Sequence, residues 1–238
     1  MIPAFSHAFQ PIVDTLSRSV FAHEALIRGI GNTSAASVLD DLDAESLQLI
    51  DRRSRIHALA MASALQMTSC LSLNALPASV GDNVNQVNAL VQQADACSFP
   101  LNRIIIEITE YEVIADPVHF SESVAEYRRL GIQLAVDDFG AGHSGLNLLA
   151  DFQPDLIKLD MNLVRNIHSR GPRQSIARAI LQVCGDLAIE VIAEGVETMD
   201  EYLWFEANGV RLFQGYLFAR PGFQSLPAVK FPLMAATL

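Results

Sequence analysis

Carboxylate and carboxamide side chains recur in this sequence directly after short apolar segments. Such segments are typical of strands that are buried on both faces of a parallel sheet. Because burying an ionised acid inside such a strand costs several kcal/mol, we expect these side chains where the strands leave the core. The ends of parallel strands meet on one face, which predicts a ring of oxygen ligands at one mouth of a barrel, as in a metal-dependent active site. The residues are Asn74, Glu107, Asp137, Asp138, Asp160 and Glu194.

Asp137 and Asp138 are adjacent acids at one of these strand ends. Two neighbouring carboxylates repel each other unless cations lie between them. A carboxylate that bridges two divalent ions is common in phosphoryl-transfer sites, where the ions lie about 3.5–4 Å apart. The alternative is an acidic pair that caps the next helix. The other oxygen ligands on the same face favour the metal site.

Lys158 interrupts an apolar strand two residues before Asp160. On a strand these two side chains point the same way, so we expect both at the barrel mouth. A lysine there would hold or polarise a water molecule or meet a phosphate oxygen. The alternative is a salt bridge that only balances buried charge.

The segment 140–145, with the sequence Gly-Ala-Gly-His-Ser-Gly, matches the G-x-G-x-x-G pattern of dinucleotide-binding loops. Asp160 follows Gly140 by twenty positions, where a ribose-binding acid would be expected. Two acids directly before the loop would repel a pyrophosphate, however, and the expected following helix is very short. An NAD-binding enzyme also leaves Glu24, Glu107 and Glu194 unexplained, so we interpret the glycines as a loop that closes over substrate.

The other residue types disfavour several kinds of site. The six histidines have no H-x-H or H-E-x-x-H spacing, and Cys70, Cys97 and Cys184 form no C-x-x-C pair. A thiolate or histidine-rich metal site and a disulfide framework are therefore disfavoured. Oxygen ligands favour a hard cation, Mg²⁺ or Mn²⁺.

Strand and helix patterns alternate from end to end, which predicts an α/β fold with a parallel sheet. Eight strand candidates favour a closed TIM-like (β/α)8 barrel over an open sheet. We expect one domain over residues 1–238, with helices over 37–50 and 52–67. The segments 9–13 and 20–27 form a hairpin-like start that does not fit a regular β/α unit.

The net charge of -11 and the absence of a Lys or Arg cluster argue against binding to polymeric nucleic acid. No apolar run approaches the ~18 residues of a membrane span. The first ten residues lack the pattern of a secretory signal. We therefore expect a cytoplasmic protein that does not contact membranes.

Several segments resemble, in order, the motifs of the EAL-domain cyclic di-GMP phosphodiesterase family. Glu24-Ala25-Leu26 with Arg28 is similar to the family signature, and the segment 10–14, Gln-Pro-Ile-Val-Asp, resembles the first strand of the family. The resemblance covers nearly the whole chain, and its specificity comes from the ordered set of motifs. The other matching segments are 107–110, 137–142, 157–160, 191–197 and 214–218.

The resemblance implies a barrel whose first strand runs antiparallel to the others, and hydrolysis of cyclic di-GMP to linear pGpG. It implies two ions, Mg²⁺ or Mn²⁺, in each site. The first ion would be held by Glu24, Asn74, Glu107 and Asp137, and the second by Asp137, Asp138 and Glu194.

The resemblance also implies roles around the metals. Lys158 and Asp160 would position the attacking water, with Glu194 as a base. Gln10, Leu26, Arg28 and Gln214 would contact or line the substrate site, and Glu110 and Glu197 would couple a loop and a dimer interface to it. A homodimer and a regulatory protein partner are expected. A non-catalytic cyclic di-GMP receptor is the alternative; such proteins usually lack some of the metal acids, and all are present here.

Overall fold

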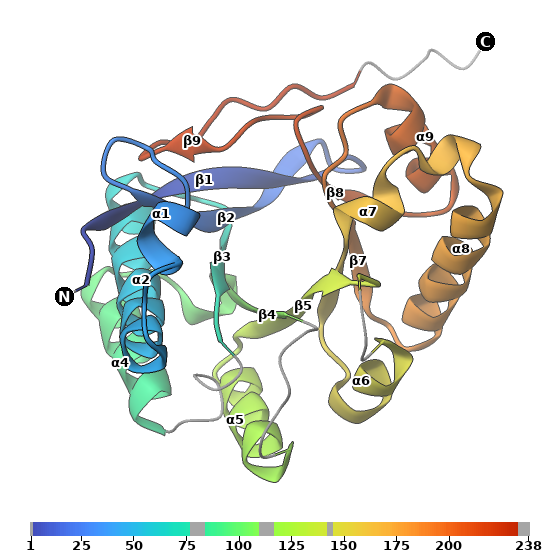
Figure 1. Cartoon of the computed structure of the whole chain (residues 1–238). Coiled ribbons are helices and arrows are strands. Elements are labelled where there is room, and N and C mark those ends of the chain that lie inside the picture. The colour runs from blue at the N-terminus through green and yellow to red at the C-terminus, as the bar shows by residue number, and fades with distance from the viewer. Residues whose placement is uncertain (1, 77–83, 110–116, 142–144, 233–238) are drawn as a thin grey trace.

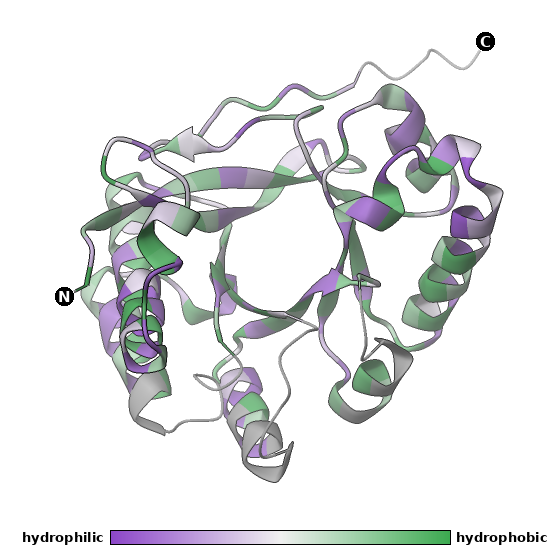
Figure 2. Cartoon of the chain, viewed as in Figure 1, coloured by the Kyte–Doolittle hydropathy of each residue, from purple (hydrophilic) through white to green (hydrophobic). Residues whose placement is uncertain are grey.

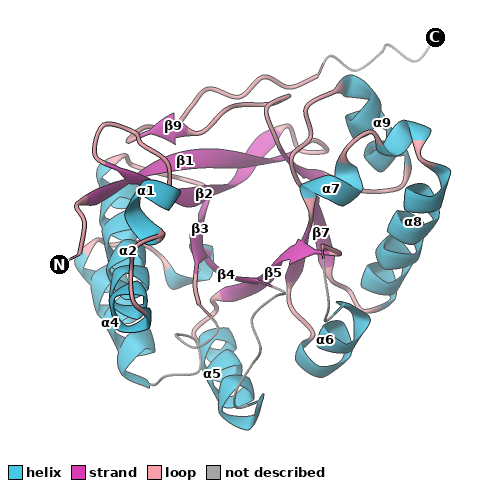
Figure 3. Cartoon of the chain, in the orientation of Figure 1, coloured by secondary structure: helices cyan, strands magenta, loops and turns pink. Residues whose placement is uncertain are grey.

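Eight strands close into a barrel in the computed structural model, which describes residues 2–76, 84–109, 117–141 and 145–232. Strands and helices alternate along the chain, and the helices surround the ring of strands (Figure 1, Figure 3). The strands are β1 (Phe5–Asp14), β2 (Ser19–Gly29), β3 (Cys70–Asn74), β4 (Ile104–Thr109), β5 (Gln133–Phe139), β6 (Leu156–Leu159), β7 (Glu190–Ala193), β8 (Leu212–Gln214) and the short β9 (Gly222–Phe223). The helices are α1 (Ala36–Leu39), α2 (Ala44–Ala64), α4 (Val84–Ala96), α5 (Pro117–Arg129), α6 (Gly145–Phe152), α7 (Met161–Val164), α8 (Gly171–Asp186) and α9 (Met199–Ala207).

The first strand runs against the rest of the barrel, as expected. β2 to β8 pair in order, each parallel to the next, whereas β1 is antiparallel to both β2 and β8 and closes the ring between them. The hairpin-like start of the sequence is therefore the β1–β2 hairpin. β9 adds to β1 next to β8, and the C-terminal segment lies outside β1 in Figure 1.

The barrel is filled at one end by apolar side chains. A buried cluster inside the ring takes one residue from each of seven strands, namely Ile12, Ala22, Ile105, Ala135, Leu156, Ile192 and Leu212. A larger cluster lies between the strands and the helices around them. Figure 2 shows the corresponding pattern, with largely hydrophobic strands and helices that carry hydrophilic residues. The inner cluster closes one mouth, so polar chemistry is confined to the other.

The helix boundaries before β3 differ from those expected. The two helices predicted over 37–50 and 52–67 are divided differently in the structure: the short α1 covers the start of the first, and one continuous helix, α2, covers the end of the first and most of the second. The N-cap of α2 is Asp43, whose carboxylate accepts a hydrogen bond from the Ser46 N–H at 2.7 Å. No glycine or proline interrupts the sequence from Ala44 to Ala64, so nothing breaks the helix between the two predicted stretches.

No helix in the described ranges is long and apolar enough to cross a membrane.

Candidate metal centre and active site

A ring of polar side chains lies one layer above the apolar cluster. Successive side chains on a strand alternate between faces, so the residue two positions after an interior residue also points into the barrel. On β2, Glu24 follows Ala22 in this way, and on β4, Glu107 follows Ile105. The same step on the other parallel strands gives Ser72, Asp137, Lys158, Glu194 and Gln214. The layer therefore brings together side chains from seven strands.

Asp137 and Asp138 would point to opposite faces if β5 were regular. The register between β5 and β6 shifts between Val136 and Phe139, and Asp138 has a φ of 54°. Aspartate tolerates this left-handed conformation better than most residues, and it turns the second carboxylate toward the first. Oxygens of Asp137, Asp138 and Glu194 lie within 4.8 Å of one another, as do oxygens of Glu24, Glu107 and Asp137. Asp137 belongs to both groups.

Lys158 places its ammonium at the centre of these acids. Its side chain is 1% exposed, and its neighbours on β6 are buried as well. The Nζ atom lies 2.7 Å from Glu194 Oε1, 2.8 Å from Glu107 Oε2, 3.1 Å from Asp137 Oδ1 and 3.5 Å from Glu24 Oε2. One positive charge thus faces four carboxylates, which leaves the cluster short of positive charge.

Glu24 is held by two carboxamides as well as by Lys158. Gln214 Nε2 donates to Glu24 Oε2 at 2.7 Å, and Asn74 Nδ2 donates to Glu24 Oε1 at 3.1 Å. Burial opposes ionisation of Glu24, but the Lys158 ammonium and these two donors outweigh it and lower the pKa of Glu24. Glu24 is therefore the acid of this cluster best suited to carry a permanent charge.

The pKa values of Glu107 and Glu194 shift in the opposite direction to that of Glu24. Burial, together with the charges of the neighbouring acids, outweighs the attraction of Lys158 and raises the pKa of Glu107 to about 8. The same causes raise the pKa of Glu194 well above its ordinary value. Burial and the adjacent Asp137 also raise the pKa of Asp138. Glu107 therefore holds a proton near neutral pH unless another cation supplies positive charge, and Glu194 and Asp138 ionise less readily than usual.

The donor set fits a hard divalent cation. Both groups contain carboxylate oxygens alone, and the side chain of Asn74 adjoins the first of them. Mg²⁺ and Mn²⁺ prefer such ligands, whereas softer metals prefer sulfur or imidazole. The two groups share one carboxylate, as expected for a pair of ions.

Two cavities meet at Glu24. One, of about 260 Å³, lies over the acids and is lined by Gln10, Lys158, Glu197 and Gln214 among others. The other, of about 310 Å³, has largely apolar walls, includes Leu26, Arg28 and Asn74, and reaches Asp51 and Arg55 on α2. The expected substrate-binding residues therefore line two cavities that share Glu24.

The remaining predicted residues lie around this region. Asp160 is buried and caps α7, because its Oδ1 accepts from the Asn162 N–H at 3.0 Å. Gln10 Nε2 donates to the Ala219 carbonyl at 3.4 Å. Glu197 pairs with Arg165 at 2.9 Å at the rim. Glu110 and residues 142–144 of the glycine loop, including His143, lie outside the described residues.

Sequence reasoning missed three contributors to this region. Ser72 donates to Glu107, and Asp51 and Arg55 form a buried ion pair, 2.6 Å long, in the wall of the larger cavity. Alternation from Asn74 would have placed Ser72 inside the barrel. Asp51 and Arg55 gave no such signal, because only packing of α2 beside the mouth brings them there.

Comparison with known proteins identifies relatives over nearly the whole chain. A family model described as the EAL domain matches residues 3–221. The antirepressor BluF of Escherichia coli, named as blue light- and temperature-regulated, is 38% identical over 226 residues, which are 94% of this chain and 56% of BluF. The cyclic di-GMP phosphodiesterase NbdA of Pseudomonas aeruginosa is 31% identical over 227 residues, which are 90% of this chain and 28% of NbdA. The chain thus spans only part of the length of these two proteins.

Solved structures agree with this fold. A standalone versatile EAL protein from Vibrio cholerae O395, in its c-di-GMP bound form, has a TM-score of 0.91 and 44% identity, with 97% of each chain covered. The manganese/cy-diGMP complex of Klebsiella pneumoniae BlrP1 has a TM-score of 0.87 and 40% identity, covering 92% of this chain and 56% of that one.

Proposed function

The chain belongs to the EAL domain family, and from that premise we propose that it hydrolyses cyclic di-GMP to linear pGpG. The observation that carries the proposal is the sharing of Asp137 between two groups of acids. We assign Glu24, Asn74, Glu107 and Asp137 to one divalent cation, and Asp137, Asp138 and Glu194 to a second, with Mg²⁺ or Mn²⁺ as the ion. Bound there, the cations would neutralise phosphate charge and acidify a water molecule.

The chain's own residues then have separate tasks. The Lys158 ammonium stabilises charge on the phosphate oxygens and, with Asp160, orients the water. The water oxygen bonds to phosphorus as one phosphorus–ribose oxygen bond breaks, and the departing oxygen takes a proton from solvent while the attacking water loses its own. We assign to Glu194, which lies 2.7 Å from the Lys158 ammonium, the role of accepting a proton from the water.

Substrate binding would use the two cavities beside Glu24. Arg28 supplies a guanidinium for phosphate, and Gln10, Leu26 and Gln214 line the region. We assign Glu110 and Glu197 to the coupling of a loop and a homodimer interface to the site. We also propose that a regulatory protein binds this chain.

A receptor function has one specific observation in its favour. BluF, 38% identical to this chain, is named as an antirepressor. A receptor needs to bind cyclic di-GMP but has no need of six side chains arranged as cation ligands. The complete acid set therefore favours the enzyme.

Binding tests the substrate class. Calorimetry in Ca²⁺ should show binding of cyclic di-GMP, and the same protein should show no binding of NADH. NADH binding without cyclic di-GMP binding would contradict the proposal and would restore the glycine loop as a dinucleotide site.

Cation affinity should rise with pH. Below about pH 8 Glu107 carries a proton in the cation-free protein, and a bound cation must displace it. Each proton released makes the affinity up to ~10-fold tighter per pH unit. Titration with Ca²⁺ at pH 7 and pH 8, in buffers of different ionisation enthalpy, should show tighter binding at pH 8 and proton release at pH 7. Equal affinity without proton release would contradict the raised pKa values.

A further inference from the structure

Ser72 is a fully buried serine inside the barrel. It lies on β3 between Cys70 and Asn74, with Glu24 and Ile105 as its partners on the neighbouring strands. Its exposed fraction is 0%. A hydroxyl at such a position needs a hydrogen-bond partner, because burying it unpaired destabilises the folded state. Its partner is Glu107, whose Oε1 accepts from Ser72 Oγ at 2.5 Å.

The two oxygens of Glu107 therefore have different neighbours. Oε1 is bonded to Ser72, whereas Oε2 accepts from Lys158 Nζ at 2.8 Å. The same ammonium contacts Asp137 and Glu194, so Oε2 is the oxygen of Glu107 that faces the other acids. Glu107 is itself only 1% exposed, so no bulk water replaces either contact.

We propose that Ser72 is a positioning residue that fixes the Glu107 carboxylate and leaves only Oε2 to a cation. The last torsion angle of a glutamate side chain has a broad range of allowed values, so a carboxylate without a fixed donor rotates easily about that bond. Ser72 removes this freedom by holding Oε1, while Oε2 faces the Lys158 ammonium that Asp137 and Glu194 also contact. The inference rests on the proposed cation site, but not on turnover.

The other acid at the base of the site is held in a comparable way. Glu24 accepts from Gln214 and Asn74 through its two oxygens. Uncharged donors thus orient both buried glutamates while adding no positive charge that would compete with a cation. Partners of this kind, behind the ligands, typically change metal affinity or activity by 10–100-fold when removed.

Replacing Ser72 tests the proposal directly. Titration of the substrate-free protein with Mn²⁺, followed by calorimetry, should show ~10–100-fold weaker binding for Ser72→Ala. Ser72→Thr keeps the hydroxyl and should bind within a few-fold of wild type. Ser6→Ala is the matched control, because Ser6 is 2% exposed on β1 and its hydroxyl accepts from Gln224 rather than contacting an acid. Its Mn²⁺ affinity should equal that of wild type.

The outcomes separate positioning from mere packing. Wild-type Mn²⁺ affinity in folded Ser72→Ala would overturn the proposal, and so would a loss that Ser72→Thr shares in full. Melting temperatures of the three variants report folding. The titration contains no cyclic di-GMP, so it is independent of turnover. If the Mn²⁺ affinity depends on Ser72 but the wild-type chain does not hydrolyse cyclic di-GMP, only the proposed function is refuted. A chain that hydrolyses, with Ser72→Ala unchanged in Mn²⁺ binding, would refute this inference alone.

Discussion

Asp137→Asn should abolish turnover of cyclic di-GMP, with a loss of at least ~10³-fold. Asp137 is the one acid common to both groups of oxygens, so its replacement weakens the binding of both proposed cations. Asparagine has nearly the same shape but no charge, and the cluster loses one of the four carboxylates around Lys158. Chromatography of cyclic di-GMP and pGpG measures the turnover, and Mn²⁺ titration should show weaker binding.

Asp186→Asn is the matched control. Asp186 is exposed on α8, where it accepts from Gln182, and its replacement should leave turnover unchanged. Wild-type turnover by folded Asp137→Asn would contradict the assignment of Asp137 to both cations.

Lys158→Met should lower turnover by ~10²-fold or more in saturating Mg²⁺, while cyclic di-GMP still binds in Ca²⁺. Methionine nearly fills the volume of the lysine stem but carries no charge. In the proposed mechanism the ammonium stabilises developing phosphate charge, and at 1% exposure the side chain is shielded from solvent. Binding depends more on the larger cavity beside the acids, whose walls do not include Lys158.

The melting temperature of Lys158→Met distinguishes a role of Lys158 in catalysis from one in balancing the charge of the acids. Without added cations, Lys158→Met leaves four acids with no counter-charge, and removing one partner of a buried ion pair costs roughly 3–5 kcal/mol. The melting temperature should therefore fall without cations and recover in Mg²⁺, whereas turnover should stay low. If turnover recovers together with stability, Lys158 only balances charge.

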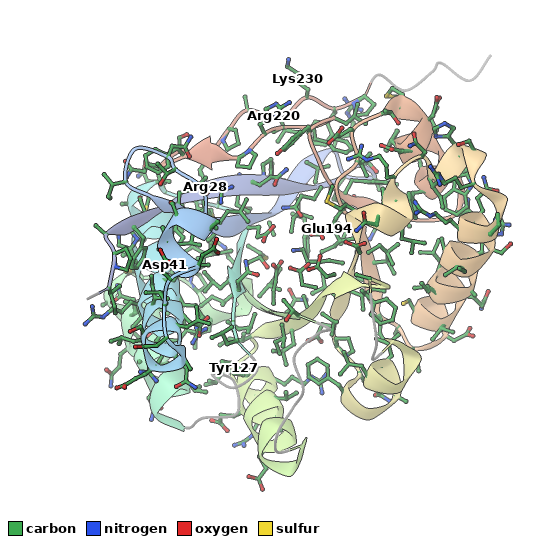
Figure 4. All side chains as sticks on the ribbon, in the orientation of Figure 1. Arg28, Asp41, Tyr127, Glu194, Arg220 and Lys230 are labelled. Carbon is green, nitrogen blue, oxygen red and sulfur yellow. The ribbon has the colours of Figure 1, made fainter. Side chains whose placement is uncertain are left out.

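The chain has one other lysine, and it serves as the control. Lys230 lies outside the ring of strands on the C-terminal segment, whereas Glu194 lies within the ring (Figure 4). Lys230→Met should change neither turnover nor the effect of Mg²⁺ on the melting temperature.

Alternation along strands is the reason so much of the site could be predicted from the sequence. Apolar runs that end in acids predicted parallel strands, and a parallel barrel brings all such ends to one mouth. Glu107 and Glu194 follow Ile105 and Ile192 by two positions, and both face the interior. The antiparallel β1 could be inferred only through the family resemblance, because alternation carries no information on strand direction.

Three features of the site could not be predicted from the sequence and are visible only in the folded structure. The positive φ of Asp138 turns two adjacent acids to one side, although regular alternation would separate them. The position of the Lys158 ammonium among four carboxylates depends on how β6 aligns with its neighbours. Asp51 on α2 reaches the cavity wall through packing between elements distant in sequence. Local patterns contain none of these alignments.

Turnover by the unaltered chain is the most direct measurement of all. Cyclic di-GMP is incubated with the protein and Mg²⁺ or Mn²⁺, and the products are separated by chromatography. We expect linear pGpG to form with cation, to be absent in excess chelator, and to form again when the cation is restored. Cyclic di-GMP that binds but remains intact in Mg²⁺ and in Mn²⁺ would contradict hydrolysis and would leave this chain a receptor.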